Sequence, residues 1–434
     1  MRVLIIVANG LQLGYLGCYG NEWVLTPTLD RLAAEGIVFD RHYSDCPDPI
    51  RARNSWRTGC YQIPVPGSES VAHHLISSRQ DLIKTLTDNA VGTTLVIENN
   101  NPITTDFAPF WKTVEGVEIA NDDKTTDIDR AIKQAVTILK KMPKREKGLI
   151  WLDWTTLLPE WKLPNEYQEF YFREDSDEKE KNGMEEEEPS EGEASLAPWI
   201  GPLPKRLEGD DDTTFIRLQR TYAGAVTYLD QNLAILLEEL EVEGLLEEMT
   251  IVVTTDSGLV LGEHGVVAAD VQGLHEERVH LPLIIRLPQK AEAGRRVATL
   301  TQPVDLMPTI LEIFGLQGPQ VHGHSLLPLC HGKAKTVREY ACSGSARGKT
   351  VEWSLRTTDW AFLLPLDETA GCGPQLYIKP EDRWEVNNII QHHPEWAQHL
   401  EETLRKFVDA ARLPGPLLPP PLGEYSATRS EPEA

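Results

Sequence analysis

The sequence predicts an α/β fold in which a mainly parallel sheet is sandwiched by helices and followed by a small C-terminal α+β subdomain. Apolar runs at residues 3–7, 148–154 and 250–254 are typical of strands buried on both faces of a parallel sheet. Segments with apolar residues at helical spacing lie between these runs, as at residues 127–141. After about residue 335 the chain changes to short β-rich pieces, which predicts the separate subdomain.

Length and composition limit the classes of protein to which the chain can belong. Its 434 residues can bury a large core, either as one α/β domain with an appendage or as two domains. The net charge of −25 argues against nucleic acid or an anionic membrane as a partner, because both carry negative charge. The six cysteines include no Cys-x-x-Cys pair, so they predict neither a disulfide framework nor a zinc site.

The sequence shows no hydrophobic segment long enough for export or membrane insertion. The apolar run after Met1 has a core of about five residues and no cleavage site follows it, which is too short for a signal peptide. No apolar run approaches the ~20 residues that span a bilayer. We therefore expect a cytoplasmic protein.

Changes in composition divide the chain into three parts. We expect an α/β domain over residues 1–334, the C-terminal subdomain over 335–412, and a proline-rich, disordered tail over 413–434. An acidic insertion at about 174–196 carries too much charge to bury apolar surface, so we expect it to be disordered as well. This insertion is either a solvated loop without a specific task or an electrostatic arm for a basic partner.

The first predicted strand ends in a turn that contains Asn9 and Gly10. Ligands of α/β proteins bind at such turns, because these lie at the carboxyl ends of parallel strands. Asn9 is therefore either a ligand group or a simple turn former. The next helix has a cap, a first-turn proline and a terminal glycine, at Thr26, Pro27 and Gly36.

Strands and helices alternate through the rest of the first domain. A strand is predicted at residues 93–98, and a long helix over 213–244 has the apolar spacing of a packing surface. The buried strand after this helix ends in Asp256. In the C-terminal part, the β-rich pieces precede a helix over residues 394–411.

Residues 39–59 resemble the nucleophile segment of the sulfatases, in the alkaline phosphatase superfamily. The match has anchors on both sides and no gap, and these anchors are Phe39, Tyr43, Ser44, Pro47, Arg53, Ser55, Thr58 and Gly59. In this register the position of the nucleophile is Pro49. Proline has no side-chain heteroatom that could attack a substrate or mature into the formylglycine of the family.

Other stretches match the same family, so that the resemblance covers nearly all of residues 2–410. They are LGCYGN at 16–21, YAGAVTYLD at 222–230, LGEHG at 261–265, VDLMPT at 304–309 and GHSLLPL at 323–329. The resemblance implies the alkaline phosphatase/sulfatase-like fold. In an active member it also implies hydrolysis of sulfate esters at a divalent metal.

The metal-binding positions implied by the resemblance are poorly kept in this chain. The family's aspartates after the first strand correspond to Asn9 and Gly10, and the position after Asp256 is the neutral Ser257. An asparagine oxygen can ligate calcium but carries no charge, and glycine has no side chain. We therefore expect at most a vestigial metal site at Asn9 and Asp256. No cofactor is expected, or calcium or another divalent metal if the site is active.

Two further groups implied by the resemblance are missing. The histidine of the family's central motif is replaced by Thr156, Leu157 and Leu158. The lysine that pairs with sulfate has no counterpart, because no lysine lies between positions 205 and 290. His275 replaces the usual tyrosine, and we expect it to be a packing or surface residue.

These losses predict a catalytically inactive sulfatase homologue that acts by binding a small anionic ligand or a protein partner. The ligand pocket would contain Arg53, Asp256, Ser257 and His264. If the alignment is correct, Pro49, Asn9, Asp256 and Arg53 converge in one cleft at the carboxyl ends of the parallel strands.

Two alternatives stay open at this point. One is a divergent hydrolase of sulfate or phosphate esters whose site is rebuilt from other residues, such as Cys46 or His264. Cys46 would otherwise be a small buried thiol. The other alternative is an interaction module that acts through the acidic insertion.

Overall fold

The computed structural model describes residues 1–67, 81–98, 107–117, 127–141, 146–155, 157–161, 163–172, 196–204, 212–268, 273–347, 350–367, 373–413 and 415–423. The acidic insertion predicted at about 174–196 therefore lies, except for its last residue, outside the described residues.

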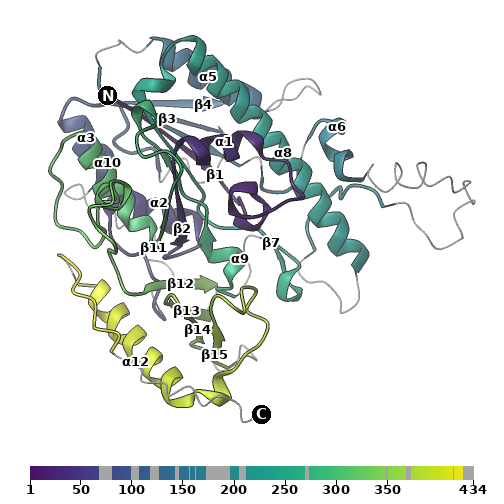
Figure 1. Cartoon of the computed structure of the whole chain (residues 1–434), viewed down its shortest axis with the longest axis vertical. Helices are drawn as coiled ribbons and strands as arrows, with labels where there is room; N and C mark the ends of the chain where they lie inside the picture. Colours follow the sequence, from purple (N-terminus) through teal and green to yellow (C-terminus); the bar gives the residue numbers. More distant parts are fainter. Residues whose placement is uncertain are drawn as a thin grey trace, which may run out of the picture.

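A nine-stranded sheet forms the centre of the molecule (Figure 1), with the strand order β11-β2-β10-β6-β1-β5-β3-β4 and β9 paired to β2. Its strands are β1 (Arg2–Ala8), β2 (Ile37–Tyr43), β3 (Gly92–Glu98), β4 (Thr113–Val117), β5 (Gly148–Trp154), β6 (Met249–Thr254), β9 (His280–Leu281), β10 (Ile284–Arg286) and β11 (Arg295–Thr301). The short strands β9 and β10 pair antiparallel with their neighbours, and the other pairs are parallel. The predicted α/β class with a mainly parallel sheet is confirmed.

Both faces of this sheet are covered by helices (Figure 1). One face packs against α1 (Pro27–Glu35), α5 (Asp127–Lys141) and α8 (Asp212–Val242), and the other against α2 (Pro49–Thr58), α3 (Leu82–Asp88) and α10 (Leu306–Ile313). Side chains of a strand alternate between faces, so every second residue of β1 joins one core and the rest join the other. This double burial is the reason why the strand is apolar without interruption.

The start of α1 shows a difference between local expectation and structure. Thr26 occupies the cap position and Pro27 the first turn, as predicted, but the Thr26 side chain makes no capping hydrogen bond. Instead the carboxylate of Asp230 in α8 accepts from the backbone N–H groups of Thr28 at 2.9 Å and Leu29 at 2.8 Å. The orphan donors of α1 are thus satisfied from another helix, which also joins α1 to α8.

A smaller antiparallel sheet follows the central one along the chain (Figure 1). It consists of β12 (Ala341–Arg347), β13 (Thr350–Arg356), β14 (Trp360–Pro365) and β15 (Gln375–Ile378). Helix α12 (Pro394–Ala411) packs on this sheet and shares a hydrophobic core with it. The small C-terminal α+β part is confirmed, whereas the exact domain limits at 334 and 412 stay predictions.

The segment after α12 differs from the disorder that its proline content predicts. Pro420 accepts a hydrogen bond from the Tyr340 hydroxyl through its carbonyl oxygen at 2.6 Å, and Leu417 and Leu422 pack against the C-terminal core. Apolar contacts with this core compensate for the cost of ordering residues 415–423. Residues 424–434 lie outside the described part of the chain.

Short elements complete the architecture. They are η1 (Leu13–Tyr15), η2 (Gly17–Tyr19), α6 (Asn165–Gln168), η4 (Phe170–Phe172), η5 (Leu246–Glu248), β7 (Val260–Leu261), η6 (Glu263–Gly265), β8 (Val267–Ala268), α9 (Glu276–Val279), η7 (Pro288–Lys290), η8 (Pro303–Asp305), α11 (Leu327–Cys330) and η10 (Ile390–His392). Among the helices of the described ranges, none combines the length and the apolar composition needed to cross a bilayer.

Candidate functional site

Helix α2 presents the segment that carries the nucleophile in the sulfatase pattern. Asp48 caps this helix, because its carboxylate accepts from the backbone N–H groups of Ile50 at 3.1 Å and Arg51 at 2.9 Å. Pro49 stands in the first turn, where its missing N–H costs no hydrogen bond and its fixed φ suits the helix. Pro49 is therefore well accommodated at a regular helix start.

Arg53 lies one turn further along α2 and uses every N–H donor of its guanidinium. Nε and Nη2 bind the two carboxylate oxygens of Asp153 at 3.0 and 2.6 Å, and Nη2 also reaches Asn9 Oδ1 at 2.8 Å. Nη1 binds the carbonyl oxygen of Pro49 at 2.7 Å and Asp256 Oδ2 at 3.3 Å. A guanidinium has five N–H donors, and the hydrogen bonds above give Arg53 five acceptor atoms. Arg53 has no donor left for a ligand in this arrangement.

The acceptors around Arg53 come from the carboxyl ends of three parallel strands. Asn9 follows β1, Asp153 is the next-to-last residue of β5, and Asp256 follows β6. The Asn9 amide donates to Asp153 Oδ1 at 2.7 Å and to the carbonyl oxygen of Trp154 at 2.9 Å, so it is also satisfied. The structure thus brings together Pro49, Asn9, Asp256 and Arg53, as the alignment predicts. We call Asn9, Arg53, Asp153 and Asp256 the Arg53 cluster.

Asp153 is a member of this cluster that the sequence motifs did not single out. The signal was present, because Asp153 is the one charged residue in the apolar run GLIWLDW. A carboxylate in a strand buried on both faces needs a partner, since an unpaired buried charge is very costly. The sequence does not say which cation supplies it.

Burial and charge make the Arg53 cluster a closed ion network. Arg53 is 1% exposed, Asp153 0% and Asp256 3%. Burial opposes the charged form of Arg53, but attraction to Asp153 and Asp256 outweighs it and raises the pKa of the guanidinium. Burial also raises the pKa of Asp256 above its usual value, although Arg53 opposes the rise. A single guanidinium is therefore shared by two buried carboxylates at the centre of the molecule.

The residues of this centre do not fit the divalent metal that the fold family implies. Calcium takes six to eight oxygen ligands at about 2.3–2.6 Å, mostly anionic ones. Here the oxygens of Asn9 and Asp256 that would ligate the metal already accept from Arg53. Within the described ranges, no group of three or more histidine, cysteine, aspartate or glutamate side chains is arranged to hold a metal ion.

The position of the family's second aspartate is also closed. Gly10 adopts a left-handed φ of +81°, and a Cβ atom there would meet Leu158 Cδ2 at 2.9 Å. Such a φ is strained for any residue with a side chain, and the contact is too short for a real Cβ. Leu158 itself stands in the region where the family motif has its histidine. Gly10 and Leu158 therefore pack directly against each other.

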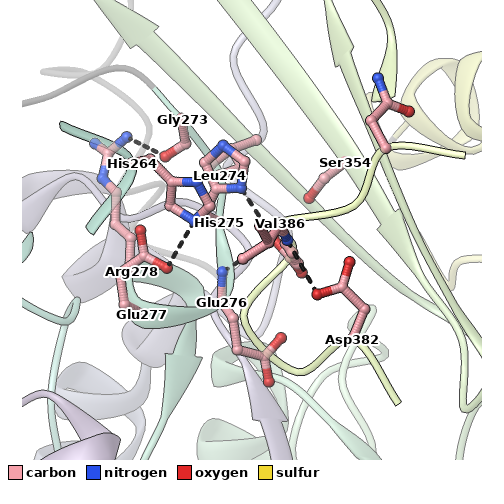
Figure 2. A network of polar contacts seen from close by, with 12 residues as sticks. His264, Gly273, Leu274, His275, Glu276, Glu277, Arg278, Ser354, Asp382 and Val386 are labelled. Atoms are coloured by element: carbon pink, nitrogen blue, oxygen red, sulfur yellow. Dashed lines mark hydrogen bonds and ion pairs between the residues drawn. The ribbon is translucent and has the colours of Figure 1, made fainter. Parts of the chain in front are cut away.

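The contacts of the four predicted pocket residues fall into two groups. Ser257 lies beside Asp256, is 4% exposed and donates its backbone N–H to Asp256 Oδ1 at 2.8 Å. His264 belongs to η6 and stacks on His275, with ring centroids 3.8 Å apart (Figure 2). No hydrogen bond, ion pair or ring contact between described residues joins His264 to the Arg53 cluster. Arg53, Asp256 and Ser257 are thus buried together, and His264 lies in a different network.

That second network connects η6 and α9 with the C-terminal sheet (Figure 2). His275 pairs with Glu385 at 3.1 Å. Glu277 Oε2 lies 3.7 Å from His264 Nε2. Burial raises the pKa of Glu277 to about 7, and burial together with His275 lowers the pKa of His264 to about 4. Between these values both side chains are neutral, so they contact each other without forming an ion pair.

Glu277 gives the free energy of unfolding a pH dependence that can be measured. Its folded pKa of about 7 exceeds its usual value of 4.5, so the folded state holds the proton more tightly. The stability that this proton supplies is complete below about pH 4.5 and is lost as the pH rises through 7. We expect Glu277→Gln to remove this loss, so that the variant gains stability relative to the wild type between pH 4.5 and pH 8.

Urea unfolding at several pH values checks this prediction. The matched control is Glu395→Gln, which removes an exposed glutamate from the start of α12 and should follow the wild-type curve. A constant difference between Glu277→Gln and the wild type over the whole pH range would show that Glu277 does not titrate as expected.

Cys46, the alternative nucleophile, lies in an unsuitable environment. Its side chain is completely buried, and burial together with Asp48 raises the pKa of the thiol far above its usual value. The thiolate is the reactive form of cysteine, and at neutral pH it is almost absent here. The simpler prediction of a buried structural thiol therefore agrees better with the geometry.

Comparison with known families and proteins identifies the scaffold. Residues 2–316 match the sulfatase family, and residues 262–410 match the family described as N-sulphoglucosamine sulphohydrolase, C-terminal. The chain is 32% identical over 211 residues to the N-acetylglucosamine-6-O-sulfatase of Bacteroides thetaiotaomicron. This alignment covers 44% of this chain and 36% of that protein. It is 28% identical over 179 residues to the arylsulfatase K of Homo sapiens, covering 39% of this chain and 33% of that protein.

These alignments span about a third of the length of the curated relatives. Among solved structures, one in complex with its substrate D-glucosamine-2-N,6-O-disulfate has a TM-score of 0.75 at 20% identity, covering 94% of this chain and 98% of that one. The phosphonate monoester hydrolase of Agrobacterium radiobacter has a TM-score of 0.69 at 17% identity, covering 94% and 95%. These likenesses show the fold, and the match over residues 2–316 shows that the chain belongs to the sulfatase family.

Proposed function

We propose that this sulfatase-family protein is catalytically inactive and acts by binding, with a small anionic ligand or a protein as its partner. The observation that carries the proposal is the saturation of Arg53, whose five donors all bind groups of the protein itself. A cation of the site that is fully used inside the protein cannot also bind the charged group of a substrate.

The chemistry of ester hydrolysis supports this proposal. Hydrolysis of a sulfate ester at a metal needs an activated nucleophile, oxygens that hold the ion, and cationic groups that stabilise the developing charge. Pro49 supplies no nucleophile, and the oxygens of Asn9 and Asp256 are bound to Arg53. The groups of a catalytic site act as a unit, so losing several of them leaves almost no rate enhancement.

The alternative is a hydrolase of sulfate or phosphate esters with a rebuilt site. The sulfatases among the curated relatives make sulfate esters the first substrates to test. Neither residue considered for such a site is well placed, because Cys46 is a buried thiol and His264 lies outside the Arg53 cluster. A cytoplasmic location and the absence of nucleic-acid or membrane partners stay predictions from the sequence.

Hydrolysis of an aryl sulfate and an aryl phosphate by the purified protein tests the proposal. We expect no release of the phenol above background between pH 5 and pH 8, with or without added calcium. The matched control is Asp256→Asn, because any trace of hydrolysis from a contaminant persists in that variant. Hydrolysis that the wild type shows and Asp256→Asn loses would overturn the proposal and favour the rebuilt site.

A further inference from the structure

A second feature of the molecule, separate from the Arg53 cluster, is a cavity of about 240 Å³ beside β2. Its walls come from the 3-10 helices η1 and η2, from β2, β9 and β11 of the central sheet, and from the segments that follow β13 and β15. None of its lining residues belongs to the Arg53 cluster. The cavity therefore joins the central sheet to the C-terminal part of the chain, away from the Arg53 cluster.

Cations outnumber anions in the lining of this cavity. Four side chains carry a permanent positive charge, and they are Arg41, Arg296, Lys379 and Arg383. Only Asp40 and Glu276 oppose them in the lining. This surplus stands out in a protein with a net charge of −25. A local positive potential draws anions to the cavity, although the protein as a whole repels them.

Two of the four cations are already paired. Arg296 binds Asp40 through Nε at 2.9 Å, and Lys379 Nζ lies 3.1 Å from Glu276 Oε2 and 3.0 Å from Glu385 Oε1. Arg41 and Arg383, in contrast, have no carboxylate partner among the residues that the structure describes. Two guanidinium groups at one cavity thus have donors available for a ligand.

His280 adds a ring to the lining of the cavity that is held between two acceptors. Its Nδ1 lies 2.7 Å from Glu276 Oε1, and its Nε2 lies 2.7 Å from the carbonyl oxygen of Asp40. Burial alone would raise the pKa of Glu276, but His280, Lys379 and Arg356 hold it well below its usual value. Both ring nitrogens of His280 therefore face acceptor oxygens.

The volume of the cavity limits the ligand. Pockets for drug-sized molecules measure about 300–1,000 Å³, and this cavity is smaller. It can take a small oxyanion or the anionic group of a larger molecule. A neighbouring cavity of about 730 Å³ shares Thr358 with it and has Lys335 in its lining. The remainder of a larger ligand could extend into that space.

We propose that this cavity is a binding site for a tetrahedral oxyanion, a sulfate or phosphate group that is free or carried as a monoester. The planar fork of a guanidinium matches two oxygens of such a group, which a lone ammonium does not. The inference rests on the proposed binding function, for which it names the ligand class and the place. It does not depend on whether the Arg53 cluster has residual activity.

Calorimetric titration of the full chain with inorganic sulfate, and separately with inorganic phosphate, tests the site. Sodium chloride keeps the ionic strength constant and serves as the reference anion. The test variant is Arg41→Gln/Arg383→Gln. The matched control is Arg31→Gln/Arg405→Gln, which removes two exposed arginines that already have carboxylate partners. Both variants lower the net charge by the same amount.

We expect saturable binding of one or both oxyanions, weakened at least about tenfold in the test variant and unchanged in the control, since ~1.4 kcal/mol of lost interaction is a factor of ten. Whichever of the two anions binds more tightly identifies the ester class. No binding to the wild type, equal binding by all three proteins, or equal losses in both variants would each overturn the inference.

The same preparations are assayed for hydrolysis of an aryl sulfate, so that the two proposals can fail separately. Hydrolysis combined with oxyanion binding at the cavity would refute catalytic inactivity and leave the site standing. Absence of both hydrolysis and oxyanion binding would refute the site and leave inactivity standing.

Discussion

Arg53→Met is expected to lower the free energy of unfolding by about 3–5 kcal/mol, the usual cost of removing one partner from a buried ion pair. Methionine keeps much of the length and apolar surface of the arginine side chain but supplies no donor. Asp153 and Asp256 then stay buried without the cation that they share. Five hydrogen bonds are lost at one substitution, which makes this the most sensitive position of the candidate site.

Urea unfolding at pH 7 measures this effect. The matched control is Arg405→Met on α12, where an exposed arginine pairs with Glu401 and the cost should stay below about 1 kcal/mol. The double variant Arg53→Met/Asp153→Asn should lose less unfolding free energy than the two single variants lose together, because the second change removes one of the unpaired carboxylates. Equal costs for Arg53→Met and Arg405→Met would show that the cluster contributes no stability.

The same variant tests the interpretation of Arg53 as an internal cation. Without the guanidinium, the oxygens of Asn9, Asp153 and Asp256 face each other with two negative charges. Added calcium should therefore raise the unfolding midpoint of Arg53→Met and leave that of the wild type unchanged, because a ligand stabilises the state that binds it. A calcium-dependent midpoint in the wild type would contradict the assignment of Arg53 as the resident cation.

Pro49→Cys alone is expected to show no hydrolysis of an aryl sulfate, even in a host that converts the cysteine to formylglycine. The substitution should fold normally, because Asp48 caps α2 and the first helical turn accepts most residues. A cysteine at a helix N-terminus is also reactive, since the helix lowers its pKa. A lack of turnover would then not be the result of a misfolded protein or an unreactive thiol.

Two readouts check this result. Labelling with a thiol reagent shows whether the introduced thiol is accessible, with the wild type as the reference for the native cysteines. The release of the phenol from an aryl sulfate measures turnover. Labelled protein with background turnover supports the proposal, whereas appreciable turnover by Pro49→Cys alone would refute it.

Restoring the metal site is harder than the sequence alone indicates. The sequence suggests Asn9→Asp, Gly10→Asp and Ser257→Asn as a simple repair. In the structure, an aspartate at position 10 would adopt a strained φ, and its Cβ would also displace the end of the Leu158 side chain, so the backbone strain is the main obstacle to Gly10→Asp.

Local patterns in the sequence determined the secondary structure and the alignment. The unbroken apolar run of β1 reflects its burial on both faces, and Pro27 and Pro49 mark the first turns of α1 and α2. Such features depend on neighbours in the chain, so they are visible without a structure. For the same reason Pro49 could be placed at the nucleophile position from flanking residues alone.

Only the tertiary structure decided what the polar residues of the family motifs do. Whether a donor is free depends on acceptors from other parts of the chain, and the acceptors of Arg53 come from residues 9, 49, 153 and 256.

Other polar residues show the same dependence on the fold. His264 lies in a different network although its motif is intact, and Asp230 caps a helix more than two hundred residues away in sequence. The cation-rich cavity likewise joins Arg41 to Arg383, which no local pattern connects. Hydrogen-bond saturation and charge balance depend on the folded arrangement. The sequence therefore shows which polar residues are present, and only the fold shows which of them contact each other.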